Sequence, residues 1–169
     1  MKITLKPFGP VDPATLEHIA KALRPFGEVA VAPPAPVPAS AFVPKRNQYR
    51  ASPFFPLCQE EPGDRVLAVT PVDLFEDGLN FVFGYATMQD RYGIISTARL
   101  GPPATPAYGD RVAKEAVHEI GHTLGLDHDP NPACVMHFSS RLEDTDRKGL
   151  AFCATCTEAA GLTVRRLRK

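Results

Sequence analysis

The sequence predicts an α+β fold, with a twisted mixed sheet and packed helices in one domain over residues 1–169. Three observations lead to this prediction. The length of 169 residues suits one domain with a sizeable core. Alternating apolar and polar residues, typical of strands, are concentrated in the first hundred positions. A long amphipathic helix pattern follows them, and no internal repeat is present.

The first 32 residues predict a strand, a helix and a second strand. Residues 2–8, KITLKPF, alternate in polarity as a strand does. Asp12 before Pro13 is typical of a helix start, with an N-cap followed by proline at the first helical position. The helix over 13–26 has its apolar residues on one face, and EVAVA at 28–32 predicts the next strand.

The middle of the chain predicts a stiff connector and three further strands. PPAPVP at 33–38 reads as a polyproline-like spacer within the domain. Residues 65–75, 79–88 and 92–100 are strand-like runs separated by Asp-Gly and Asp-Arg turn dipeptides. Because the strands come first, the sheet is expected to be complete before the last long helix begins.

The helix over 107–126 carries the residues suited to chemistry. Asp110 is placed to be its N-cap. His118 and His122 are four residues apart, so their side chains lie on one face about 5–6 Å apart at Cβ and can share one ion. Glu119 lies beside the first of them, where its carboxylate can reach a metal-bound water without being a ligand. Apolar residues at helical spacing are Val112, Ala116, Val117, Ile120 and Leu124.

A glycine near the end of this helix indicates how the chain brings a third ligand close to the first two. Gly125 permits the left-handed turn that ends a helix, and the redirected chain brings back His128. Three imidazoles leave the fourth tetrahedral position to water, as in a catalytic zinc site. The run HEIGHTLGLDH fits H-E-x-x-H-x-x-G-x-x-H at every fixed position.

These motifs resemble the metzincin clan of zinc metallopeptidases, and Met136 is placed to be its Met-turn residue beneath the zinc. PNPACVMHF followed by FCATC is similar to the archaemetzincin family in particular. Cys134, Cys153 and Cys156 match three of that family's four cysteines, and Asp129 stands where the remaining one is expected. The resemblance implies an active-site helix, a Met-turn and a C-terminal helix around the sheet.

The resemblance also implies two Zn²⁺ ions per chain, one catalytic and one structural. From the residues alone, Cys153 and Cys156 make half a zinc knuckle that Cys134 could close. A redox C-x-x-C is the alternative, but the surrounding sequence lacks a thioredoxin-like frame. Cys58 is expected to be a small buried hydrophobe.

Two interpretations of Asp129 are open. Its carboxylate can bind zinc at about 2.0–2.2 Å and complete a Cys₃Asp site. Alternatively, it braces the turn beneath the catalytic ion, as the aspartate after the third histidine does in the adamalysin-like metzincins. The spacing DPNPAC, which keeps the family's four-residue gap, favours the ligand. Asp127 is expected to face outward.

The predicted function is hydrolysis of peptide bonds by a zinc-activated water, with Glu119 as general base. The resemblance implies a peptide or protein substrate lying antiparallel to an edge strand, for which residues 81–88 are the candidate. The alternative is a zinc-binding protein with vestigial peptidase activity that acts through protein contacts. The intact site residues favour the enzyme: His118, Glu119, His122 and His128.

Composition argues against other partners. Nineteen basic residues balance nineteen acidic ones, and tryptophan is absent, so a nucleic-acid module is not expected. No stretch approaches the length of a membrane span, and the start has no export signal. We therefore expect a cytoplasmic monomer.

Overall fold

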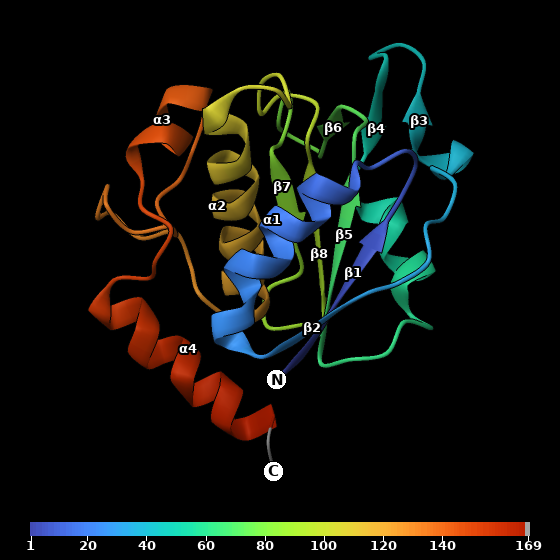
Figure 1. Ribbon diagram of the computed structural model, residues 1–169. Helices are drawn as coiled ribbons and strands as arrows, with labels where there is room; N and C mark the ends of the chain where they lie inside the picture. Colours follow the sequence, from blue (N-terminus) through green and yellow to red (C-terminus); the bar gives the residue numbers. More distant parts are fainter. Residues whose placement is uncertain (168–169) are drawn as a thin grey trace.

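The computed structural model describes residues 1–167, and its main sheet has five strands (Figure 1). The strand order is β2-β1-β5-β8-β7. Four strands are parallel and β7 runs antiparallel at one edge, so the sheet is mixed, as the sequence predicts. The strands are β1 Lys2–Pro7, β2 Glu28–Val31, β5 Arg65–Thr70, β7 Gly84–Ala86 and β8 Tyr92–Ser96.

A second, three-stranded sheet was not foreseen. Its order is β3-β4-β6, with β3 at Phe42–Val43, β4 at Gln48–Arg50 and β6 at Leu74–Phe75. The strand expected over 65–75 is therefore wrong as one unit. Pro71 directly follows β5 and cannot donate a ladder hydrogen bond, so the chain leaves the main sheet there and β6 pairs with β4 instead.

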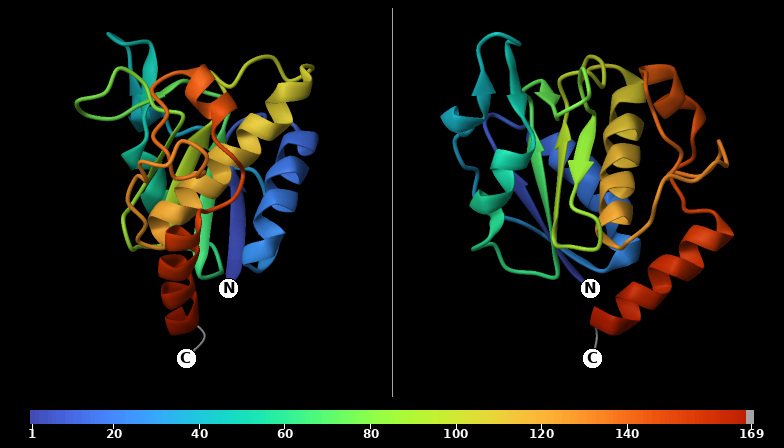
Figure 2. Two further views of the ribbon diagram at one scale, coloured as in Figure 1. Left: turned by 90° about the vertical axis from the view of Figure 1, so that its left-hand side faces the viewer. Right: turned by 180° about the vertical axis from the view of Figure 1, so that it is seen from behind.

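The helices lie mainly on one face of the main sheet (Figures 1 and 2). Helices α1 and α2 pack against each other over this face, and α3 lies beside α2. The opposite face is covered by the 3₁₀ segment Ser52–Cys58. The bounds are α1 Pro13–Leu23, α2 Pro106–Thr123, α3 Leu142–Arg147 and α4 Ala154–Leu167, with further 3₁₀ turns at Arg24–Phe26 and Ala39–Ala41.

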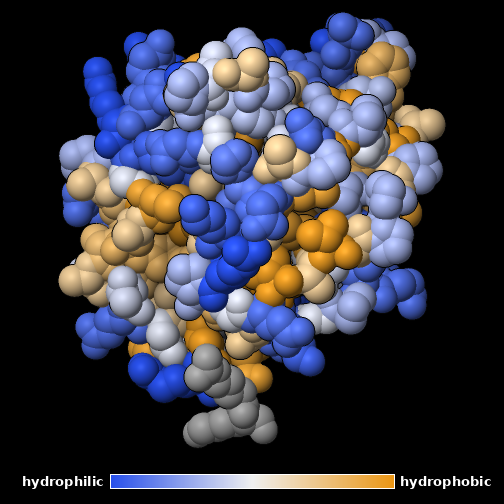
Figure 3. Space-filling model, in the orientation of Figure 1, coloured by the Kyte–Doolittle hydropathy of each residue, from blue (hydrophilic) through white to orange (hydrophobic). Residues whose placement is uncertain are grey.

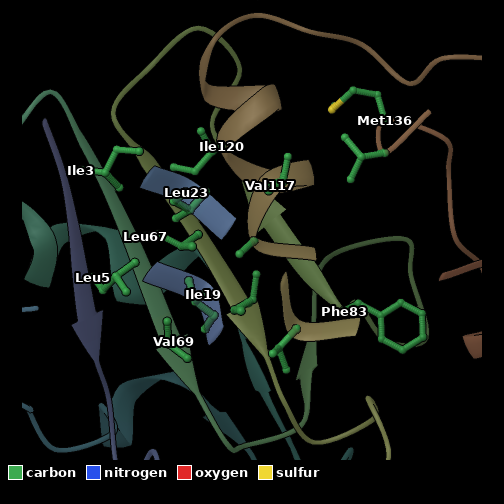
Figure 4. Close-up of a cluster of buried hydrophobic side chains, with 14 of the residues drawn as sticks. Ile3, Leu5, Ile19, Leu23, Leu67, Val69, Phe83, Val117, Ile120 and Met136 are labelled. Carbon is green, nitrogen blue, oxygen red and sulfur yellow. The ribbon is translucent and has the colours of Figure 1, made fainter. Parts of the chain in front are cut away.

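Strand β5 shows how the sheet forms two cores. Its successive side chains point to opposite faces. Leu67 and Val69 therefore join the cluster under the helices, whereas Val66 and Ala68 join the cluster under the 3₁₀ segment. Figure 4 shows the helix-side cluster, where sheet residues meet α1 and α2. Both faces of β5 are covered, which explains why its residues 66–69 are all apolar.

Two expected boundaries differ in ways that matter for the site. Helix α2 begins at Pro106 with Thr105 as N-cap, so Asp110 is not the cap, and its carboxylate pairs with Lys114 at 2.6 Å. Of the strand expected over 79–88, only Gly84–Ala86 pairs with β8, and a single bridge joins Val82 to Leu74. The remainder forms loop walls beside the edge strand.

The molecular surface viewed in Figure 3 has polar and apolar residues interspersed. Within residues 1–167, no helix combines the length and the hydropathy that a membrane crossing requires.

Candidate metal centre

Three imidazoles converge as the spacing predicts. The ligand atoms of His118, His122 and His128 all lie within 4.8 Å of one another. The Nε2 atoms of His118 and His122 are 3.1 Å apart. Two nitrogens bound tetrahedrally at about 2.0–2.1 Å from one zinc would be about 3.3 Å apart, so this pair fits a shared ion. The donor set is that of a zinc site with an open fourth position.

The end of α2 explains how His128 reaches the other two. Gly125 adopts a φ of 90°, which favours glycine, and the N–H of Leu126 donates to Gly121 O. The chain therefore reverses directly after the helix. This reversal also places Leu126 O 2.7 Å from His122 Nδ1, while His118 Nδ1 lies 2.8 Å from Val135 O. With each Nδ1–H donating to a carbonyl, the Nε2 atoms are left free as ligands.

The surroundings of the imidazoles make them suitable ligands, with His118 buried, His122 half-buried and His128 exposed. Loss of solvation lowers the pKa of His118 well below its usual range and lowers the pKa of His122 and His128 as well. The positive charge of Lys148 lowers all three further. A neutral imidazole has the lone pair that a metal needs, so the site favours metal over protons.

Glu119 lies next to His118 on α2, and one of its carboxylate oxygens has no hydrogen-bond partner among the described residues. The residue is buried, and the oxygen without a partner among these residues is Oε2. Burial, and then the neighbouring Glu115, raise its pKa well above the usual range. Gly84 on β7 lies so close that a Cβ there would collide with the Glu119 carboxylate. The absence of a side chain at Gly84 therefore lets the edge strand pass directly over Glu119.

A cavity of about 440 Å³ opens beside these groups. Glu115, Glu119 and the three histidines line it together with residues 79–86, Met88 and residues 138–140. Most of its other walls are apolar, and Phe138 packs its ring edge-on to His128 with centroids 5.0 Å apart. The cavity is a cleft between α2 and the edge strand.

Met136 packs against α2 beside Gly121. It is fully buried, and a Cβ at Gly121, the residue before His122, would collide with its sulfur. The methionine therefore packs against the active-site helix, where a Met-turn residue is expected. Figure 4 shows its side chain near α2.

The cysteines and Asp129 form a second cluster. Asp129, Cys134, Cys153 and Cys156 offer ligand atoms within 4.8 Å of one another. Asp129 Oδ2 lies 3.2 Å from Cys153 Sγ and 3.3 Å from Cys156 Sγ. Burial, followed by the hydrogen bond to Asp129, raises the pKa of the Cys156 thiol. These are four zinc-type donors in a closed arrangement, and the fit to zinc is good.

Cys58 does not belong to that cluster. It is fully buried in the second core and donates to Phe54 O, as expected for a small hydrophobe. Burial raises the pKa of its thiol to about 12, so it is an inert thiol at neutral pH. Asp127 is exposed, as predicted.

Three residues in or near the cleft were not identified from the motifs in the sequence. Glu115, one helical turn before Glu119, lines the cleft, and its spacing alone could have indicated this. Lys148 and Phe138 approach from a distant segment, and no sequence pattern marks them.

The fold and the three-histidine cleft define a zinc metallopeptidase. Comparison with known proteins agrees: residues 61–161 match the model of peptidase family M54. The chain is 45% identical over 145 residues to the archaemetzincin of Methanopyrus kandleri, covering 84% of this chain and 81% of that one. It is 37% identical over 168 residues to the archaemetzincin of Halobacterium salinarum, covering 92% and 97%.

Solved structures give the same result. The crystal structure of the archaemetzincin of M. kandleri superposes with a TM-score of 0.89 at 38% identity, covering 98% of this chain and 96% of that one. That of Archaeoglobus fulgidus superposes with a TM-score of 0.86 at 38% identity, covering 94% and 99%. The chain belongs to peptidase family M54, the archaemetzincins. The resemblance stated from the motifs is confirmed.

Proposed function

We propose that this chain hydrolyses peptide bonds at a zinc ion held by His118, His122 and His128, with Glu119 as general base. One observation carries the proposal: three imidazoles and one buried carboxylate with an unpartnered oxygen meet on the wall of a single cleft. Zinc bound there supplies Lewis acidity and makes water acidic enough to attack near neutral pH.

Glu119 is suited to carry the proton in this reaction. It takes a proton from the attacking water and passes it to the leaving amine. A general base works best when its pKa lies near the working pH, and burial moves the pKa of Glu119 in that direction. The unpartnered Oε2 is free to hold the proton between the two transfers.

The edge strand supports a peptide substrate. Strand β7 has β8 on one side only, because it ends the sheet. Its residues Gly84, Tyr85 and Ala86 line the cleft together with the histidines. We propose that the substrate backbone adds to β7 as an antiparallel strand, which would place a peptide bond beside the metal.

We further propose a second, structural zinc at Asp129, Cys134, Cys153 and Cys156. The closeness of Asp129 Oδ2 to two sulfurs supports the ligand interpretation over the brace. The site would tie the loop after α2 to the start of α4, two segments that already share the helix-side core. A carboxylate is a harder ligand than a thiolate, so this site should hold zinc less tightly than four cysteines would.

The experiment is zinc content per chain combined with cleavage of a mixed peptide library. The expected result is two zinc ions per chain and cleavage that a chelator abolishes. Glu119→Gln, which keeps the side-chain shape, is the matched control and should retain both ions without cleaving. If the fully zinc-loaded parent leaves the whole library intact, the vestigial alternative replaces the proposal.

A further inference from the structure

A buried lysine lies behind the wall of the catalytic cleft. The side chain of Lys148 is 0% exposed, and its Nζ is 3.0 Å from Oε1 of Glu115, whose side chain is 3% exposed. Thr145 Oγ1 donates to the same oxygen at 3.0 Å. The Lys148 Nζ has no well-directed hydrogen bond among the described residues, so its contact with Glu115 is chiefly a charge pair.

Glu115 lies close to the proposed general base and to a proposed metal ligand. It lies one helical turn before Glu119 and three residues before His118, on the face of α2 that lines the cleft. A carboxylate beside a zinc site is itself a good zinc ligand. Left unpaired, Glu115 would be a second buried anion close to the general base and a rival for the open metal position.

Lys148 also reaches across from the opposite wall. It directly follows α3, and the segment before α3 contributes residues 138–140 to the cleft. Its pairing with Glu115, together with the buried hydrogen bond from Thr145, therefore joins the two walls from inside, whereas some other contacts between α2 and α3 lie nearer the surface. The ion pair of Arg111 with Asp146 is one of these, with the Asp146 side chain 43% exposed.

We propose that Lys148 is a positioning residue of the catalytic centre, which holds the Glu115 carboxylate away from the metal and fixes the wall formed by residues 138–140. Lys148 does not line the cleft, and besides the effect of its charge on the histidines it acts through Glu115. The inference rests on the proposed function, because it assigns Lys148 a task only if a catalytic metal is present. It predicts that the effect of losing Lys148 depends on Glu115.

Lys114 offers a matched control. It too is a nearly buried lysine with a carboxylate partner, since its side chain is 7% exposed and its Nζ lies 2.6 Å from Asp110 Oδ2. It also contacts the α3 region, by donating to Asp146 O. However, neither Lys114 nor Asp110 lines the catalytic cleft. Removing it tests the loss of a buried lysine without disturbing Glu115.

The test uses Lys148→Met, Glu115→Gln and the double variant that carries both substitutions. Lys114→Met is the separate control. Three quantities are measured at equal zinc content: the affinity for acetohydroxamate, which binds a catalytic zinc, and the kcat and KM for a peptide. Lys148→Met should weaken hydroxamate binding and lower kcat by roughly 10–100-fold, the range typical of outer-shell partners of a metal site. The double variant should recover most of both losses.

Lys114→Met should lower the melting temperature but leave hydroxamate affinity and kcat as in the parent. If Lys148→Met does not fold, Lys148→Gln replaces it in the same cycle, with the same expected directions. The proposal is overturned if the Lys148 variant binds hydroxamate like the parent, or if adding Glu115→Gln restores nothing. Hydroxamate binding and cleavage by the parent test the proposed function separately from these differences.

Discussion

The histidine centre and the cysteine cluster are joined by one peptide bond, between His128 and Asp129, yet they differ in access to the cleft and in the number and type of their donors. The histidines face a cleft of about 440 Å³ and leave a coordination position open. The cysteine cluster is lined by four donors and does not border that cleft. An open site can exchange water and substrate, whereas a closed one can only hold the chain together.

Under the proposed function, exposure and donor number, more than sequence distance, distinguish the catalytic from the structural metal site. The loop from Gly125 to Met136 serves both. Its start turns His128 toward the helix, and Asp129 N donates to Met136 O to fold the loop back on itself. Adjacent side chains then point into different sites.

The largest effect is expected from Glu119→Ala. The three imidazoles remain, so zinc should stay bound, but kcat should fall by about 10²–10⁴-fold because the general base is lost. Steady-state kinetics at measured zinc content check this. Glu158→Ala, at an exposed position on α4, is the control. Turnover near the parent level would remove Glu119 from the mechanism.

Cys153→Ser should act on stability instead. A structural zinc contributes directly to folding free energy, so weakening it should cost about 4 kcal/mol, or about 8–16 °C in Tm. Thermal unfolding with and without added zinc measures this, and Thr155→Ser, within the same C-x-x-C, is the control. An unchanged Tm together with an unchanged zinc content would mean that the cysteine cluster holds no metal.

Gly84→Ala should impair the catalytic centre alone. The new Cβ would displace the Glu119 carboxylate, and a misplacement near 1 Å can reduce turnover about 100-fold. Zinc content and Tm should change little, since no ligand is touched. Gly161→Ala, where a Cβ has space, is the control. Full activity in Gly84→Ala would show that the close approach of β7 to Glu119 is dispensable.

The smallest effects are expected at Asp129. Under the ligand interpretation, Asp129→Cys tightens retention of the second ion and Asp129→Ala loosens it, each by about tenfold. Titration with a chelator at constant pH resolves the two ions. Asp127→Ala, at the exposed residue before His128, is the control. Equal retention by all three variants would favour the brace.

Much of the helix-borne site was predictable because its geometry is local. The spacing of His118 and His122, the turn at Gly125 and the return of His128 follow from helix periodicity and backbone chemistry over eleven residues. The proximity of Cys134 to Cys153 and Cys156 was inferred from zinc-ligand spacing, and the family's pattern pointed to Asp129.

Pairings between residues far apart in the chain could not be predicted from the sequence. Strand β6 pairs with β4, and Lys148 pairs with Glu115 across 33 residues, through contacts that no local pattern records. Asp110 was misjudged as a cap because a proline four residues earlier starts the helix, and Asp110 then serves as the partner of Lys114. The edge strand was predicted too long because loop walls of a cleft can be as apolar as a strand.

The two proposed zinc sites lie side by side and should bind their ions independently. Zinc per chain in the parent, in His122→Ala and in Cys153→Ser, measured by elemental analysis after gel filtration, tests this independence. The account predicts two ions in the parent and one in each variant, with cleavage lost in His122→Ala while its Tm stays near that of the parent. A single ion in the parent, or the loss of both ions from His122→Ala, would contradict it.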